Sequence, residues 1–234
     1  FTEDVPDLIV ANAEVWNIDF SKRLKARMLD ITQNKEYSLE EREAFFTKIG
    51  SYLSFIGSVI VRRNVWMTRD RTSYYGTLFI HVGVVFQHPS PQKIKVIADV
   101  LIRVRYGNAM WSPRAFEIWL FKWPELIWSF PDFSDQAKRA VCRLEAWRRF
   151  KIIFFYRGIG VYTLEEYRRF FACRVNRMMR IIPFLISIFP KNVANLVASI
   201  YFARKRKHRM YLYDLLCSPH ATWASRLITL FVDV

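Results

Sequence analysis

The residues with the clearest chemical meaning are arginines and lysines, which gather in three consecutive runs of the second half of the chain. They are Arg139, Arg143, Arg148, Arg149 and Lys151; then Arg168, Arg169, Arg174, Arg177 and Arg180; then Arg204, Lys205, Arg206, Lys207 and Arg209. A guanidinium group can bind a phosphate through two parallel hydrogen bonds, so Arg suits phosphate recognition better than Lys. Aromatic residues such as Trp147 and Tyr211 interleave with these runs. Arg beside aromatic residues is typical of proteins that hold looped RNA, and the pattern predicts an RNA-binding surface.

The charge of the chain supports an anionic partner. Lys and Arg number 36 against 21 Asp and Glu, a formal net charge of +15. Residues Lys138–Arg209 contain 18 basic and 3 acidic residues, whereas Phe1–Gly50 contain 7 and 10. A folded domain with such an excess repels itself until an anion neutralises it. Two alternatives stay open: the aromatic residues can be core beneath a solvated arginine face, and Arg204–Arg209 also matches a nuclear-localisation or lipid-headgroup pattern.

Residues that could catalyse a reaction or bind a metal form no recognised motif. None of the four histidines stands beside a Cys or a pair of carboxylates at ligand spacing, and His81 is expected in the core or an interface. Gly158-Ile159-Gly160 lacks the third glycine of a dinucleotide fingerprint and suits a helix end or turn. Glu165 and Glu166 follow Thr163 in a capping box, which explains the pair without catalysis. We therefore expect no catalytic residue, metal site, cofactor or small-molecule substrate, and a protein that is not an enzyme.

The three cysteines, Cys142, Cys173 and Cys217, are odd in number and widely spaced. This spacing argues against a disulfide framework and predicts buried free thiols in a reducing compartment.

Helix-start signals recur along the chain, and the helices that they begin would position the basic runs. Ser90, Ser112 and Ser218 each precede a proline, Ser38 and Thr163 begin capping boxes, and Ser134 precedes Asp135. Apolar residues then follow at helical spacing, as in Ile94, Ile97, Ala98, Leu101 and Val104 after Ser90. Glycine is scarce, with 7 residues, which disfavours a fold of strands and turns. The sequence predicts an all-α fold, an antiparallel helical array that is either α-solenoid-like or an irregular bundle.

The array is expected to be one basic domain at residues 58–234, preceded by a helical front at residues 1–57. The segment Ile181–Ala203 is apolar but contains Pro183 and Pro190, and a membrane-spanning helix needs about 20 mostly apolar residues. We expect Pro190-Lys191-Asn192 to form a loop between two helices and predict no transmembrane span.

One part of the chain resembles a known group of proteins. Phe116–Phe130, followed by Phe133-Ser134-Asp135-Gln136-Ala137 and Leu144-Glu145-Ala146-Trp147, is similar to degenerate helical repeats of organellar RNA-handling proteins, the pentatricopeptide, octotricopeptide and FASTK-like group. The basic, Trp-, Phe- and Arg-rich composition also resembles that of lineage-specific mitochondrial ribosomal proteins of divergent protists. The resemblance covers Ser90–Arg209 and implies a structural or assembly role in a mitochondrial ribonucleoprotein. The base-reading positions of true pentatricopeptide repeats have no counterparts here, so the resemblance does not extend to base-specific recognition.

These observations predict a structural or assembly component of a mitochondrial ribosome, located in the matrix. Its partners would be ribosomal RNA, bound at phosphates by the Arg-rich helices, and ribosomal or assembly proteins, with no membrane contact expected. The alternative is an accessory subunit of an inner-membrane respiratory or ATP-synthase complex, with Ile181–Ala203 near or in lipid. A third hypothesis is a stand-alone RNA-processing factor. The first residue is Phe1 and not Met, which either removal of an organellar transit peptide or further chain upstream would explain.

Overall fold

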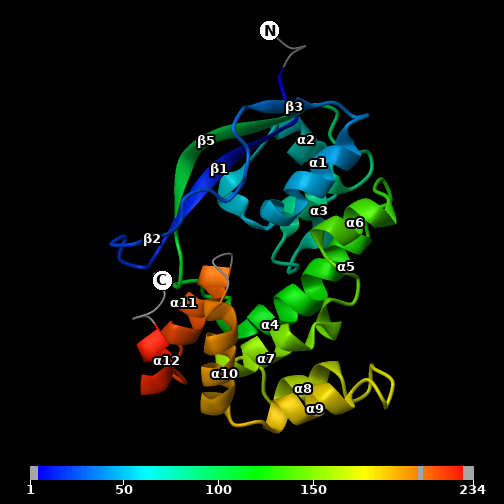
Figure 1. Cartoon of the computed structure of the whole chain (residues 1–234). Helices are drawn as coiled ribbons and strands as arrows, with labels where there is room; N and C mark the ends of the chain where they lie inside the picture. The colour runs from blue at the N-terminus through cyan, green and yellow to red at the C-terminus, as the bar shows by residue number, and fades with distance from the viewer. Residues whose placement is uncertain (1–4, 205–207, 229–234) are drawn as a thin grey trace. The chain divides into compact units, whose positions relative to one another are not determined.

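The computed structural model describes residues 5–204 and 208–228, and the chain divides into two units (Figure 1). The first unit comprises Phe1–Asn108 and Phe121–Ala146, and the second comprises Ala109–Leu120 and Trp147–Val234. The predicted division at residue 57 falls inside the first unit. The first unit contains a β-sheet, whereas the described part of the second unit is helical.

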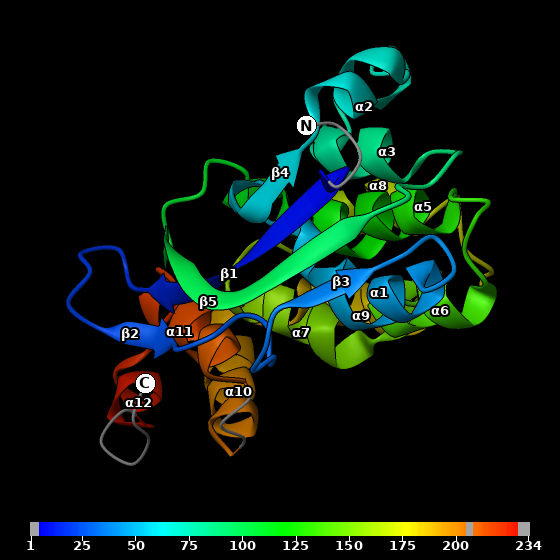
Figure 2. The same ribbon diagram turned by 90° about the horizontal axis from the view of Figure 1, so that it is seen from above.

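The sheet of the first unit has five strands. They are β1 (Leu8–Trp16), β2 (Arg23–Lys25), β3 (Lys35–Tyr37), β4 (Val59–Val61) and β5 (Ile94–Arg105). Strand β1 is central: it pairs in parallel with β5 along its whole length and antiparallel with β2 and β4, while β3 pairs antiparallel with β5 (Figure 2). The prediction of an all-α fold, including a helical front at residues 1–57, is therefore wrong.

Strand β5 shows why the helical prediction failed there. Its apolar residues Ile94, Val96, Ala98, Val100, Ile102 and Val104 alternate with the others, and the side chains of alternate residues point to one face of a sheet. The first three are buried and the last three are half-buried. Most of them are β-branched, which favours strands over helices. The helical spacing of Ile94, Ile97, Ala98, Leu101 and Val104 arises because the run also contains apolar residues outside the alternating set.

Five helices of the first unit accompany the sheet. They are α1 (Arg42–Ile49), α2 (Arg63–Thr68), α3 (Ile80–Phe86), α5 (Trp123–Trp128) and α6 (Asp135–Val141), with short 3-10 helices at Gly50–Ser54, Ile56–Ser58 and Thr72–Tyr74. Helices α1 and α3 lie on one face of the curved sheet (Figures 1 and 2). Their aromatic residues form the core there: Phe46 of α1 stacks on Phe133 with ring centroids 4.0 Å apart, and Phe45 stacks on Phe86 of α3 at 6.0 Å.

The described helices of the second unit are short. They are α4 (Ala115–Glu117), α7 (Phe150–Gly158), α8 (Leu164–Phe170), α9 (Ile181–Ile188), α10 (Lys191–Ala203), α11 (Arg209–Cys217) and α12 (Trp223–Leu227), with 3-10 turns at Ser112–Arg114 and Ala146–Arg148. A π-helical turn, Ile118–Lys122, crosses the boundary between the units. Fully buried Phe116, Tyr162 and Phe171 form the core of the second unit, with Phe116 and Tyr162 centroids 4.6 Å apart.

The predicted helix starts had mixed outcomes. Thr163 and Glu166 form the predicted capping box of α8, and Ser134 caps α6 by accepting a hydrogen bond from the Ala137 amide at 3.2 Å. Ser112-Pro113 begins a 3-10 turn. The other predictions were wrong: Ser38 lies four residues before α1, Ser90 precedes strand β5, and Ser218 ends α11.

The segment Ile181–Ala203 forms two helices, as predicted, and the break falls at Phe189–Pro190, with Lys191 already in α10. Among the described residues, no single helix is long and apolar enough to cross a membrane. Helices α9 and α10 together reach the length and hydropathy of a span, but they meet at an angle of 110°.

Candidate nucleic-acid interface

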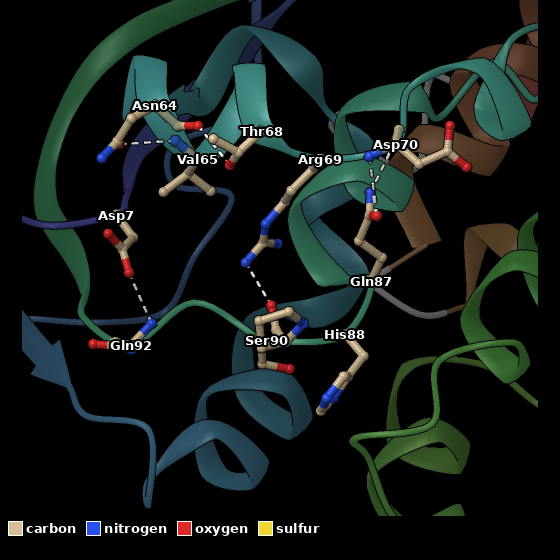
Figure 3. Close-up of a pocket in the computed structure, with 11 residues that line it drawn as sticks. Asp7, Asn64, Val65, Thr68, Arg69, Asp70, Gln87, His88, Ser90 and Gln92 are labelled. Atoms are coloured by element: carbon tan, nitrogen blue, oxygen red, sulfur yellow. Dashed lines mark hydrogen bonds between the residues drawn. The ribbon is translucent and has the colours of Figure 1, made fainter.

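A polar pocket of about 400 Å³ in the first unit is the place where catalytic chemistry could be expected (Figure 3). The Arg69 side chain crosses it and donates hydrogen bonds to the carbonyl oxygens of Val84, Val85 and Pro89. Gln87 bonds the Asp70 backbone in both directions, with its amide nitrogen 2.8 Å from the carbonyl oxygen and its amide oxygen 3.2 Å from the Asp70 nitrogen. These polar groups join one backbone segment to another, so the pocket is a structural junction.

Beside this pocket, His88, Asp132 and Ser90 have the residue types of a hydrolytic triad. His88 Nδ1 lies 2.7 Å from Asp132 Oδ1, but the Ser90 hydroxyl donates to Asp132 Oδ2 at 2.8 Å and not to the imidazole. Nucleophilic catalysis needs the histidine to accept the serine proton, and this arrangement lacks that bond. Burial alone would raise the pKa of Asp132, but hydrogen bonds from His88 and Ser90 hold it below its usual value. Asp132 therefore serves as an acceptor that fixes the 88–90 segment.

No group of three or more His, Cys, Asp or Glu residues could hold a metal ion within residues 5–204 and 208–228. The three cysteines are free, as predicted, but Cys173 and Cys217 are exposed and only Cys142 is half-buried. His81 is a core histidine, as predicted, with Nε2 2.8 Å from the Leu53 carbonyl oxygen. Gly158 ends α7, and Gly160 has a φ of 86°, which confirms a turn at Gly158-Ile159-Gly160.

The predicted RNA-binding residues are mostly at the surface. Arg139, Arg143, Arg148, Arg149, Lys151, Arg168, Arg169, Arg174, Arg177 and Arg204 are exposed, and Arg180 and Arg209 are half-buried. Lys205, Arg206 and Lys207 lie outside the described residues. Arg139 and Arg143 belong to the first unit and the others to the second. The surface of the second unit therefore contains most of the described members of the predicted set.

The first unit balances its charges internally. Its sequence holds 19 basic and 16 acidic residues of the chain's 36 and 21. Ion pairs join Arg23 and Arg103 to Glu14, Lys93 and Lys95 to Glu36, Lys35 to Glu41, Arg62 to Asp7, and Arg139 to Asp135. Seven of the 19 basic residues of the first unit are thus opposite a carboxylate.

The second unit has 17 basic residues and only 5 acidic ones. One carboxylate, Glu117, accepts from both Arg114 at 3.0 Å and Arg169 at 3.2 Å. Across the described part of the chain, eight exposed arginine side chains form no hydrogen bond or ion pair: Arg63, Arg105, Arg143, Arg149, Arg168, Arg174, Arg177 and Arg204. Five of these eight belong to the second unit, which therefore presents guanidinium groups that are free to bind an external anion.

Three other basic residues of the second unit make contacts within it. Arg157 is buried and donates to the carbonyl oxygens of Phe189 at 2.6 Å and Tyr162 at 3.1 Å, and burial lowers its pKa. Arg180 donates to the Ala172 carbonyl oxygen, which closes the segment between α8 and α9. Lys151 Nζ lies 3.4 Å from the Tyr201 hydroxyl. Arg157 is not in the predicted set, whereas Arg180 is in it and is partly a structural residue.

The capping box positions two of the exposed arginines. The Thr163 hydroxyl and amide both contact Glu166 Oε2, and Thr163 Oγ1 accepts from the Glu165 amide at 3.2 Å. These bonds fix the start of α8, so Arg168 and Arg169 extend from a helix with a defined first turn.

The aromatic residues among the basic runs are core residues more than stacking platforms. Trp147, Phe155, Tyr156 and Phe170 are buried, and Phe150, Phe154, Tyr211 and Tyr213 are half-buried. Burial raises the pKa of Tyr156 far above its ordinary value. Bases stack on exposed rings, and the exposed rings of the described part of the second unit are others: Trp111, Phe184, Phe189, Tyr201 and Trp223. The chemistry accessible along the basic runs is therefore mainly that of guanidinium groups.

The titration of His220 reflects the positive field of the second unit. Burial lowers its pKa, and repulsion from Lys191 and Arg157 lowers it further. A third positive charge is disfavoured there, which is the expected effect of like charges at short range.

Comparisons with protein-family models, with curated proteins and with solved structures find nothing that matches this chain. The resemblance to organellar helical-repeat and mitochondrial ribosomal proteins therefore stays a prediction.

The basic surface could be located from the sequence, but paired and unpaired arginines could not be distinguished there. Arg169 pairs with Glu117, 52 positions earlier, and nothing in the local sequence indicates that contact. The one available signal was the shortage of acidic residues, from which the sequence analysis predicted an anionic partner.

Proposed function

We propose that this protein is a structural or assembly component of a mitochondrial ribosome and that its second unit binds ribosomal RNA through phosphate contacts. The observation that carries the proposal is the contrast in charge balance: the first unit has 19 basic and 16 acidic residues, whereas the second has 17 and 5 and leaves Arg149, Arg168, Arg174, Arg177 and Arg204 exposed without a carboxylate. Unpaired arginines at this density are costly for an isolated domain and favourable on a polyanion.

The buried aromatic residues indicate how the RNA would be bound. Sequence-specific RNA recognition usually stacks unpaired bases on exposed rings, and the eight rings named above among the basic runs are buried or half-buried. The arginines would contact the backbone phosphates, so affinity would depend on charge and shape and little on sequence. A scaffold protein that holds folded ribosomal RNA needs this kind of contact.

The test is RNA affinity as a function of salt for two matched triple variants. Arg168→Gln, Arg174→Gln and Arg177→Gln remove three unpaired charges of the second unit. Arg23→Gln, Lys35→Gln and Lys95→Gln remove three charges that are ion-paired in the first unit. Both variants lower the net charge equally, so a merely diffuse attraction would weaken both to the same extent.

We expect the wild-type affinity for a ribosomal RNA hairpin to fall by roughly 10³ or more between about 50 and 200 mM salt if several phosphates are contacted. The second-unit variant should lose up to about 2 from the slope of log affinity against log salt, and the first-unit variant should lose little. Hairpins of different sequence should bind alike. Equal losses in the two variants, or no binding at low salt, would contradict the proposal.

A further inference from the structure

Helix α9 has an unusual distribution of apolar residues for a helix at a protein surface. Its outward side consists of Ile181, Ile182, Phe184, Leu185 and Ile188, continued by Phe189, and all six side chains are exposed. With 3.6 residues per turn they share one face of the helix. Leu185 is 54% exposed and Ile188 52%. The outward face contains no polar residue.

The opposite face of α9 is the one that the second unit buries. Pro183, Ile186 and Ser187 point inward, and the Tyr162 hydroxyl donates to the Pro183 carbonyl oxygen at 3.0 Å. Arg157 holds the Phe189 carbonyl oxygen at 2.6 Å. The helix is therefore firmly attached, and a small rotation cannot hide its outer face. A surface helix normally turns polar residues outward, and α9 does the reverse.

Basic residues flank this apolar face. Arg174 and Arg177 precede α9, are exposed and make no ion pair with any described residue; Lys191 follows it and is half-buried. Between Ala172 and Pro190 the sequence has no acidic residue, and Met178, in the same stretch, is 75% exposed. Helix α8, which lies beside α9 (Figure 1), has two glutamates; Glu165 is exposed, and Glu166 is engaged with Thr163.

We propose that the outer face of α9 lies on the surface of an anionic lipid membrane. An interfacial helix places apolar side chains below the headgroups, while arginines and lysines at its borders attract anionic lipid. The outward face of α9 and the charges of Arg174, Arg177 and Lys191 match these two requirements. The proposal revises the expectation of no membrane contact and goes beyond the ribosomal RNA contact, on which it does not depend.

The shape of the surface favours lipid over the side chains of a partner protein. The apolar groove of about 310 Å³ in the second unit is lined by α7 and α10 residues such as Phe150, Phe154 and Tyr201, and from α9 it includes only the inward residue Ile186. The outward residues of α9 do not line this groove, so the outer face of α9 is a protruding surface and not a pocket. Because α10 leaves α9 at 110°, α9 alone would lie along the membrane, which makes the contact peripheral.

The experiment is flotation of the full chain with lipid vesicles after nuclease treatment. The vesicles are phosphatidylcholine alone or phosphatidylcholine with phosphatidylglycerol. The test variant is Ile182→Asn, Leu185→Asn and Ile188→Asn, whose side chains are exposed and outside the core. The matched control is Ile60→Asn with Leu101→Asn, two equally exposed apolar residues of the first unit. RNA affinity is measured on every variant.

We expect the wild type and the control to float with anionic vesicles, and the α9 variant to bind them at least roughly tenfold more weakly with unchanged RNA affinity. Arg174→Gln with Arg177→Gln should reduce binding to anionic vesicles by about fivefold per arginine and leave the neutral vesicles unaffected. A wild type that fails to float, or an α9 variant that floats equally well, would overturn the membrane proposal. The proposal would also be overturned if the α9 substitutions changed only the oligomeric state, from oligomer to monomer, and left vesicle binding unchanged. None of these outcomes bears on RNA binding, which the parallel assay decides.

Discussion

Asn12 is the residue on which the centre of the sheet depends. It lies fully buried in β1 where the register with β5 shifts. Its amide group donates to the carbonyl oxygens of Leu29 at 2.9 Å and Ala98 at 3.1 Å, and its oxygen accepts from the Leu29 amide at 2.9 Å. One side chain thus satisfies the backbone groups that the irregular register leaves unpaired.

We predict that Asn12→Leu lowers the free energy of unfolding by about 2–4 kcal/mol, because it leaves buried donors and acceptors without partners. The matched control is Gln136→Leu, an exposed amide residue on α6, which should change stability by less than about 0.5 kcal/mol. Urea unfolding followed by circular dichroism measures both. Equal stability of Asn12→Leu and the wild type would show that the bonds of Asn12 contribute nothing.

His81 makes the stability of the protein depend on pH. Burial lowers its pKa, the hydrogen bond to Leu53 opposes this in part, and its buried Nδ1 has no partner among the described residues. The folded state therefore binds its proton less readily than the unfolded state. Stability should be complete above the ordinary histidine pKa of about 6.5 and should fall as the pH drops below it toward the lowered folded pKa.

The prediction is that the unfolding midpoint falls between about pH 7.5 and pH 5, and that His81→Gln flattens the fall. The Gln side chain can still donate to the Leu53 carbonyl oxygen but cannot be protonated. Some pH dependence should remain, because the pKa of His220 is also lowered. An unchanged pH profile in His81→Gln would exclude His81 as its source.

At the scale of elements, capping separates a correct helix prediction from a wrong one. Thr163 and Ser38 begin the same sequence pattern, but only Thr163 caps a helix. Ser38 instead donates to Glu40 at 2.6 Å in an exposed turn, and α1 begins later, at Arg42.

Removing the two hydroxyls should therefore have different effects. Thr163→Ala should destabilise the protein by about 1 kcal/mol, the usual cost of losing an N-cap, whereas Ser38→Ala should stay within about 0.5 kcal/mol of the wild type. Thermal unfolding of both variants compares them directly. A similar effect for the two would mean that the α8 capping box is not formed in solution.

The elements that the sequence predicted well are those defined by local chemistry. The cap of α6 at Ser134, the cap of α8 at Thr163 and the break before α10 depend on a few neighbouring residues, and each was predicted near its place. The sheet was missed, although the alternation in Ile94–Arg105 was a readable signal. Strand β1 gives less warning, since it is buried on both faces and its partner β5 lies about 85 residues later in the sequence.

The candidate site divides in the same way. The basic runs and the shortage of carboxylates could be read from the sequence, and with them the expectation of an anionic partner. Which arginines are unpaired depends on tertiary contacts such as Arg169 with Glu117. The outward apolar face of α9 could not be predicted either, because the sequence of α9 is apolar nearly all round and only packing decides which side is covered.

At the scale of the whole molecule, charge and burial place the two proposed contacts in the second unit. The first unit is nearly neutral, with 19 basic and 16 acidic residues. The second unit combines unpaired arginines with an exposed apolar helix face. A partner that binds only the folded state stabilises it by mass action, so the second unit should gain most from assembly.

The measurement that tests the central claim most directly is sedimentation of the protein from lysed organelles through a density gradient, with and without ribonuclease. If the second unit holds the protein on ribosomal RNA, the protein should sediment with ribosomal particles in detergent, move to the top of the gradient after ribonuclease, and be released by high salt. The variant Arg168→Gln, Arg174→Gln and Arg177→Gln should remain near the top without ribonuclease. A protein that sediments with a detergent-solubilised membrane complex and is unaffected by ribonuclease would contradict the account.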